Sequence, residues 1–163
     1  MHDILSSWWR GLGAMPAWLG LGRPRFRAMM NRHFPNLPWE ESRIIAPELS
    51  EHKRLESMEV AELIHRHADR SLPEEETFDV ALMIGAGCQG QNHLYQDMGF
   101  STRQQLAAMI AWNFPALKRA NHRDMKWKKF IYKQLCLEDG PYVCRSPSCA
   151  VCPDYSVCFG PEE

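Results

Sequence analysis

Apolar residues recur with the spacing of one helix face through the middle of the chain. Val60, Leu63 and Ile64 lie at positions i, i+3 and i+4. His67 takes the i+7 position, so the stripe predicts a buried, hydrogen-bonded histidine; a metal-ligand role for His65 and His67 is the less common alternative. No alternating apolar run indicates a sheet, and the pattern therefore predicts an all-α fold.

A capping signal and a glycine pair delimit the next predicted helix. Ser71 is followed three residues later by Glu74, the pattern of a capping box, and the proline between them suits a first helical turn. These signals predict a helix over residues 73–86, ended by Gly85-Ala86-Gly87 because glycine adopts the left-handed conformation that closes helices. Cys88 would then lie at a helix end near the surface, where its thiol either fills a gap or faces a metal centre.

Two further helices are predicted in the following stretch. The run 91–99 contains His93 and ends on a glycine typical of helix C-termini. Ser101 and Gln104 form a second capping box, and the helix that they start stops before Pro115, because a residue that precedes proline disfavours the helical conformation. The apolar face of this helix consists of Leu106, Met109 and Ile110.

The last predicted helix leads directly into the C-terminal tail. It runs over residues 124–138, with Asp124 as its N-cap and Gly140-Pro141 as its end. Its last turn carries Cys136. The residues predicted to face inward are Trp127, Phe130, Ile131 and Leu135.

The N-terminal stretch is rich in tryptophan and leucine but lacks the pattern of a membrane span. Arg10, Pro16 and several glycines interrupt it well short of the roughly 20 apolar residues that a span needs. It also lacks the basic start and clean apolar run of a secretory signal. Its tryptophans either dock on the core or form a surface for a partner; they are Trp8, Trp9 and Trp18.

Length, charge and cysteine content bound the class of protein. A chain of 163 residues is long enough for one folding unit with its own core. Its net charge of −1, from 19 basic and 20 acidic residues, indicates neither a nucleic-acid-binding face nor a polybasic membrane anchor. Six cysteines are too few for a disulfide scaffold, so we expect the reducing cytoplasm. The predicted parts are an N-terminal arm with an irregular segment (1–47), a helical domain (48–140) and a cysteine-rich metal-binding tail (141–163).

Four of the six cysteines gather in the tail, separated by four, two and five residues. Pro147, Pro153 and Gly160 interrupt the stretch, which predicts an irregular loop in place of a helix or strand. The clustered thiols are Cys144, Cys149, Cys152 and Cys158.

Thiols this close together form disulfides, bind zinc or hold an iron–sulfur cluster. Zinc fingers usually separate two close ligand pairs by a structured spacer of about 12–20 residues. Here all four thiols lie in one continuous segment, and short staggered gaps allow a chain to wrap around a cluster that is wider than a single ion. The spacing favours an iron–sulfur cluster and leaves zinc, disulfides and unligated thiols open.

The first three tail cysteines match the run of plant-type two-iron ferredoxins only in part, because the fourth ligand of those proteins is distant and their domain is β-rich. The complete four-cysteine pattern resembles the NifQ family, the molybdenum-donor proteins of nitrogen fixation. The resemblance covers residues 78–163, and Tyr95 and Met98 depart from the Trp and Leu that are usual in the family. The segments that support it besides the cysteines are 125–130, 134–136 and 158–160.

The resemblance implies a function as well as a family. The protein would be a cytoplasmic iron–sulfur protein that receives molybdenum, holds it in a molybdenum–iron–sulfur cluster and passes it to the machinery that assembles the iron–molybdenum cofactor. The implied partners are the nitrogenase cofactor-assembly scaffold and the nitrogenase iron protein, and the implied role is that of a metal donor and not of an enzyme. The residues alone leave open an iron–sulfur electron carrier or a zinc-stabilised helical interaction module.

A dense basic run precedes the tail. Its lysines and one arginine inside the loop are predicted to attract an anionic cluster or molybdate, because nearby cations offset such charge; a solvated helix face is the alternative. These residues are Lys126, Lys128, Lys129 and Arg145.

Two cysteines and one histidine outside the loop are candidate additional ligands. The loop already supplies the four thiolates that a four-iron cluster uses. Because molybdenum takes more ligands than a tetrahedral iron, Cys136, and after it Cys88 or His93, is predicted to complete the site only in the molybdenum-loaded form.

Overall fold

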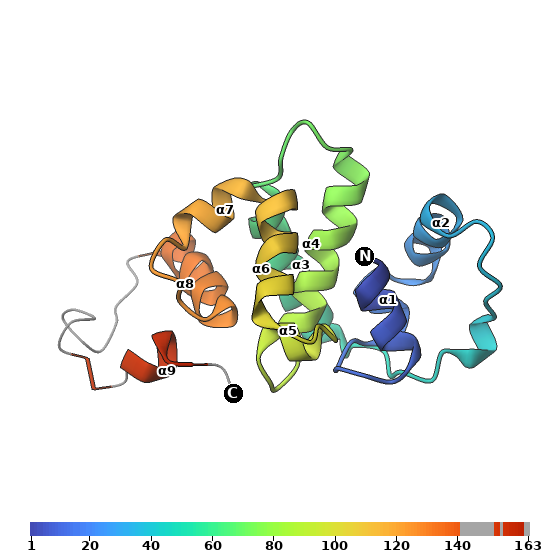
Figure 1. The fold of residues 1–163 in the computed structure, drawn as a ribbon, viewed down its shortest axis with the longest axis horizontal. Coiled ribbons are helices and arrows are strands. Elements are labelled where there is room, and N and C mark those ends of the chain that lie inside the picture. Colours follow the sequence, from blue (N-terminus) through green and yellow to red (C-terminus); the bar gives the residue numbers. More distant parts are fainter. Residues whose placement is uncertain (141–151, 154, 162–163) are drawn as a thin grey trace.

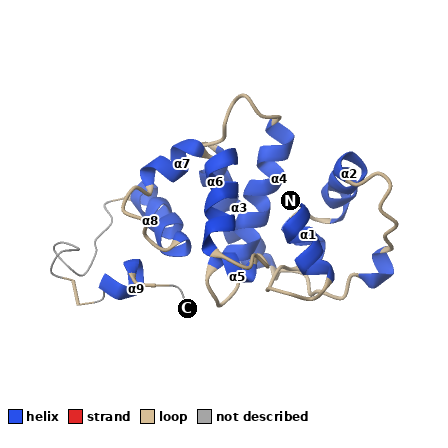
Figure 2. Cartoon of the chain, in the orientation of Figure 1, coloured by secondary structure: helices blue, strands red, loops and turns tan. Residues whose placement is uncertain are grey.

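The computed structural model describes residues 1–140, 152–153 and 155–161, and the molecule is drawn in Figure 1. Helices form the regular structure of this part of the chain, and no strand occurs in it (Figure 2), which confirms the predicted all-α class. The α-helices are α1 (His2–Trp9), α2 (Arg23–His33), α3 (Glu51–His65), α4 (Glu74–Cys88), α5 (Leu94–Asp97), α6 (Arg103–Asn113), α7 (Pro115–Ala120), α8 (Trp127–Asp139) and α9 (Tyr155–Phe159), and the 3-10 helices are η1 (Ala17–Gly20) and η2 (Glu41–Arg43).

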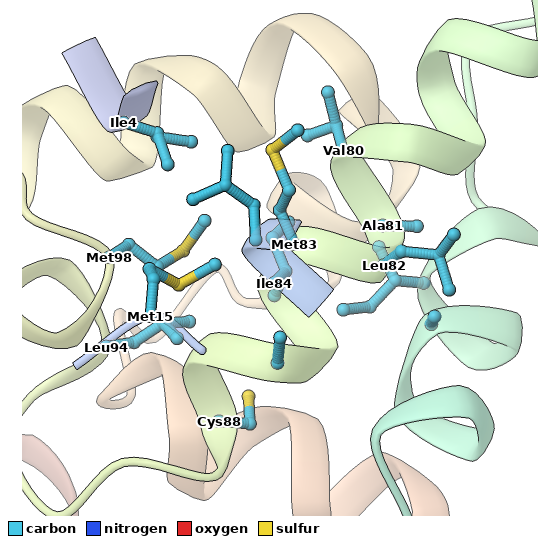
Figure 3. Packing of buried hydrophobic residues seen from close by; sticks show 14 of the residues in the cluster. Ile4, Met15, Val80, Ala81, Leu82, Met83, Ile84, Cys88, Leu94 and Met98 are labelled. Atoms are coloured by element: carbon cyan, nitrogen blue, oxygen red, sulfur yellow. The ribbon is translucent and has the colours of Figure 1, made fainter. Parts of the chain in front are cut away.

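Helices α3 and α4 pack against each other at the centre of the molecule. Figure 1 shows α7 and α8 toward one end and α1 and α2 toward the other. The core between them contains several methionines, whose flexible side chains fill irregular gaps. Figure 3 labels Met15, Leu94 and Met98 among the residues of this core, and all three are buried.

Gly85 and Gly87 do not end a helix, so that prediction is wrong. Helix α4 continues to Cys88, and both glycines are buried inside it. A Cβ atom on Gly85 would lie 2.2 Å from the backbone oxygen of Ser57 in α3, and one on Gly87 would lie 2.7 Å from Cγ of Met98. The missing side chains let neighbouring segments approach α4 closely.

Gly85→Ala is expected to destabilise the fold because the new methyl group meets a backbone oxygen that cannot rotate away. Overpacking of this kind costs about 1–3 kcal/mol or more, and the better helix propensity of alanine, about 1 kcal/mol, offsets only part of it. Calorimetry should show a Tm lowered by several degrees relative to wild type. The exposed change Ala108→Ser on α6 is the control; equal Tm values for both variants would contradict the close packing of α3 on α4.

The start of α4 also differs from its prediction. Ser71 is not a cap, because its backbone N–H and its hydroxyl both donate to Oδ1 of Asp69, at 2.9 and 2.7 Å. The residue before the helix is Pro73, and no side chain caps the first turn. Three glutamates, residues 74–76, occupy that turn, where negative charge interacts favourably with the helix dipole.

The second predicted capping box is displaced by one residue. The amide of Gln105 donates to Oγ1 of Thr102 at 3.3 Å, and the amide of Thr102 donates to Oε1 of Gln105 at 3.1 Å. Thr102 and Gln105, and not Ser101 and Gln104, therefore form the capping pair. Helix α6 ends at Asn113, which confirms the predicted stop before Pro115; Leu106 and Ile110 are buried and Met109 is half-buried.

Helix α8 begins three residues later than predicted. Asp124 has a φ of 54° and is not a helix cap; the residue before α8 is Lys126. The side chain of Asn121 closes this turn, because its Nδ2 donates to the carbonyl of Met125 at 2.8 Å and its Oδ1 accepts from the amide of Met125 at 2.9 Å. The inward face is confirmed, with Trp127, Phe130 and Ile131 buried and Leu135 half-buried.

The two histidines near the end of α3 contact neighbouring protein groups through their ring nitrogens. His67 lies beyond the end of α3 at His65 and is half-buried, so its place on the helical stripe is wrong. Its Nδ1 lies 3.0 Å from the carbonyl oxygen of Leu63, which confirms the hydrogen-bonded state. Nε2 of His65 lies 3.3 Å from Oγ1 of Thr77.

The N-terminal arm contains two helices, α1 and α2, that the hydrophobic pattern did not predict. The prediction that the tryptophans of the arm dock on the core is confirmed for Trp8 and Trp18, which are both buried. Their ring centroids lie 5.5 and 5.8 Å, respectively, from the ring centroid of Phe26. Trp9 is half-buried beside them. The segment between Pro35 and Pro47 is irregular except for η2.

A buried carboxylate ties α2 to α4. Asp79 is paired with Arg25 and Arg32, and its side chain is 1% exposed. Burial raises the pKa of Asp79, while the two guanidinium groups act in the opposite direction.

None of the helices in the described segments is long and apolar enough to span a bilayer.

Candidate metal centre

Two of the four tail cysteines belong to the described part of the chain. Cys144 and Cys149 lie outside the described residues, whereas Cys152 and Cys158 are half-buried. Cys158 belongs to the short helix α9, so the prediction of an irregular loop is wrong for this part of the tail. The amide of Tyr155 donates to the carbonyl of Cys152 at 3.2 Å, which joins the helix to the preceding cysteine.

Helix α9 is held against the start of α8. The amide of Lys126 donates to the carbonyl of Cys158 at 2.8 Å, and Nζ of Lys126 donates to the carbonyl of Ser156 at 3.2 Å. The guanidinium of Arg123 lies 5.1 Å from the ring centre of Phe159. Figure 1 shows the result, with α9 at the α8 end of the molecule, away from α1 and α2.

A cavity of about 490 Å³ lies where α5, α8 and α9 meet. Two of its lining residues, Ser156 and Val157, directly precede Cys158 in α9. The lining residues within the described segments are His93, Leu94, Lys126, Lys128, Lys129, Ser156 and Val157. The structure thus brings one predicted ligand and three predicted cationic residues next to the tail helix.

The three lysines differ in what they bind. Lys128 forms an ion pair with Asp97 and donates to the carbonyl of Gly90 at 2.9 Å. Asp97 is completely buried, and it also accepts from the amide and side chain of Asn92, at 3.1 Å each. Lys128 therefore neutralises a buried carboxylate, whereas Lys126 and Lys129 present their charge to the cavity.

Asp97 is the important residue that the sequence analysis missed. It lies three residues after Leu94 and one before Met98, both of which are buried, so an acidic group on an apolar helix face was the available signal. A buried carboxylate needs a cationic partner. That requirement points to one of the lysines of the basic run.

Cys88 is a core residue, and its predicted place near the surface is wrong. Its side chain is buried, and Figure 3 shows it at the end of α4 below the apolar cluster. Burial raises the pKa of the Cys88 thiol to about 12, against the opposing influence of Lys128. Because a metal ligand must be a thiolate, this environment disfavours metal binding by Cys88.

The remaining predicted ligands are at different places. Cys136 is exposed in the last turn of α8, seven residues after the cavity-lining Lys129, which is about 10 Å along the helix axis. His93 lines the cavity, and its ring stacks on that of Tyr95 with 6.2 Å between centroids. Arg145 lies outside the described residues. Within the described segments, no three His, Cys, Asp or Glu side chains form a ready metal site.

These features define a class of protein: a small helical protein with a cysteine-bearing tail docked on the basic start of a helix. A family model described as NifQ matches residues 1–160. The protein NifQ of Azotobacter vinelandii is 38% identical over 172 residues, covering 99% of this chain and 87% of that protein. The protein NifQ of Rhodobacter capsulatus is 33% identical over 152 residues, covering 93% and 81% respectively. No solved structure matches.

The chain therefore belongs to the NifQ family. This membership gives it a role in nitrogen fixation and confirms the family indicated by the cysteine pattern. The similarity extends over the N-terminal arm as well, whereas the sequence motifs limited the resemblance to residues 78–163.

Proposed function

We propose that this protein is an iron–sulfur molybdenum donor, which binds molybdenum as cargo and supplies it for assembly of the nitrogenase iron–molybdenum cofactor. Membership of the NifQ family is the observation that carries the proposal. The thiol-rich tail supplies the chemistry, because thiolates are soft ligands that suit iron–sulfur clusters.

Four thiolates hold the cluster in this proposal: Cys144, Cys149, Cys152 and Cys158. The tail geometry supports the assignment for its last member, since the backbone of Cys158 is fixed by Lys126 while its side chain is only half-buried. Cys136 and His93 remain candidates for the molybdenum-loaded form. Cys88 is left out because its thiol is buried in the core.

A donor must release its cargo as well as bind it. Described contacts between α9 and the start of α8 include two hydrogen bonds from Lys126 and one cation–π contact from Arg123. Cys158 and Phe159 pack against the core while only partly buried, and a five-residue helix without a buried residue opens locally at a low free-energy cost compared with global unfolding. The tail could therefore move toward an acceptor while α3, α4 and α8 stay folded.

The acceptors proposed are the nitrogenase cofactor-assembly scaffold and the nitrogenase iron protein, met in the cytoplasm. Transfer to a partner fits a cluster beside the short helix α9, which has no buried residue, better than one enclosed in a core. Helices α1 and α2 of the N-terminal arm lie at the opposite end of the molecule from α9 (Figure 1).

Metal analysis of anaerobically purified protein tests this function. We expect iron, acid-labile sulfide and, after growth with molybdate, molybdenum in the same fraction. Iron and sulfide without molybdenum under those conditions would support an electron carrier instead. Zinc alone would support a zinc-stabilised interaction module and overturn the proposal.

A further inference from the structure

We propose that the cavity between α5, α8 and α9 binds a tetrahedral oxyanion dianion of the molybdate class. This inference rests on the proposed function, because the oxyanion would be the form in which molybdenum reaches the protein. The cavity volume of about 490 Å³ leaves room for such an anion together with several waters, each of which occupies about 30 Å³ in the liquid.

The lining of the cavity is cationic. Lys126 and Lys129 belong to the start of α8 and His93 to the residue before α5, and none of the lining residues in the described part of the chain is a carboxylate. The nearby carboxylate of Asp97 is fully buried and already paired with Lys128. Among the described residues, Lys129 is exposed and forms no ion pair. The charge of the two lysines is therefore available to an anion.

The beginning of α8 adds a second requirement for negative charge. Lys126 precedes the helix without a side-chain cap, and the first turn contains no acidic residue. Lysines at this place oppose the helix dipole, and the first amides of a helix have no intrahelical acceptor. Helix α4 shows the usual arrangement, with glutamates at residues 74–76 in its first turn. A bound dianion would supply the missing negative charge at α8.

The position of the cavity relates the anion to the cluster. Ser156 and Val157 form its α9 wall, and the next residue is Cys158. Lys126 connects the cavity to Cys158, because it lines the cavity and its backbone amide donates to the carbonyl of Cys158 at 2.8 Å. An oxyanion in the cavity would thus be held within one helical turn of a cluster ligand, before its oxygen ligands are exchanged for sulfur.

The test is binding of molybdate to the full-length, iron–sulfur-loaded protein by equilibrium dialysis at low ionic strength. Lys126→Gln/Lys129→Gln should weaken binding about tenfold or more, because it removes two charge-assisted contacts. The matched control is Lys53→Gln/Arg70→Gln, which removes two exposed charges elsewhere and should leave the affinity within about twofold. Added sodium chloride should weaken wild-type binding, and sulfate at matched ionic strength should compete.

Iron content, visible spectrum and thermal unfolding of the double variant separate this inference from the proposed function. Iron content and spectrum should match wild type, because the four tail cysteines are unchanged and the backbone bond from Lys126 to Cys158 remains. The midpoint of thermal unfolding should fall only slightly, because the variant loses the exposed hydrogen bond from Nζ of Lys126 to the carbonyl of Ser156. Unchanged molybdate affinity in an iron-loaded double variant would overturn the oxyanion site and leave the donor function standing. Failure of the wild-type chain to bind iron would instead overturn the proposed function.

Discussion

Full-length protein carrying Cys158→Ala is expected to lose most of the iron that the wild-type chain binds, together with its visible absorption. The substitution removes a thiolate and leaves one iron of the cluster open to water. The fold should persist, because α9 is fixed through the carbonyl groups of Ser156 and Cys158, which the change leaves in place. Iron analysis and circular dichroism of anaerobically prepared protein measure both properties.

Cys136→Ala is the matched control for this thiol. It also removes one cysteine, but from the exposed last turn of α8, about 10 Å along the helix from the cavity-lining Lys129. We expect its iron content to equal that of wild type, with any loss confined to molybdenum. Equal loss of iron from both variants would show that Cys136 is a primary ligand, and full iron in Cys158→Ala would remove Cys158 from the ligand set.

Lys128→Met is expected to destabilise the protein by about 3–5 kcal/mol, because it leaves the completely buried Asp97 without its cation. That is a large share of the roughly 5–15 kcal/mol by which a domain is stable. Urea unfolding followed by circular dichroism should show a much lower midpoint. Lys129→Met, one residue along the same helix and exposed, should change stability by no more than about 0.5 kcal/mol.

A second substitution checks the physical reason. Asp97→Asn combined with Lys128→Met removes both charges, so part of the lost stability should return, because the largest penalty comes from the unpaired buried carboxylate. Equal unfolding midpoints for Lys128→Met and Lys129→Met would contradict the buried ion pair. In that case the charge of Lys128, like that of Lys129, would be available to a bound anion.

The sequence predicted helices well where apolar spacing and proline acted together. The stop before Pro115 and the inward face of Trp127, Phe130 and Ile131 are local properties of the chain, and the structure confirms them. Helix starts were less predictable, because several side chains in each stretch are able to cap. Thr102 and not Ser101 takes that role, and Ser71 bonds to Asp69 instead.

Features that depend on distant segments could not be predicted in this way. A glycine at position 85 is expected both at a helix end and at a close contact between two helices, so the local sequence does not distinguish them. The close approach of the Ser57 backbone in α3 shows that Gly85 belongs to a helix contact. Lys128 and Lys129 are adjacent and chemically identical in the sequence, yet only Lys128 meets the carboxylate of Asp97, 31 residues away. The thiol pattern identified the family, while the cavity beside it arises from three segments that folding brings together.

The hydrogen bonds that hold α9 do not depend on which side chains the tail carries. Lys126 binds the carbonyl oxygens of Ser156 and Cys158, groups that every amino acid possesses. Residues 156 and 158 are therefore free to vary in side chain, as far as these two bonds are concerned, without releasing the helix. Metal chemistry at the tail and attachment of the tail are separable properties, which mutation and evolution could alter one at a time.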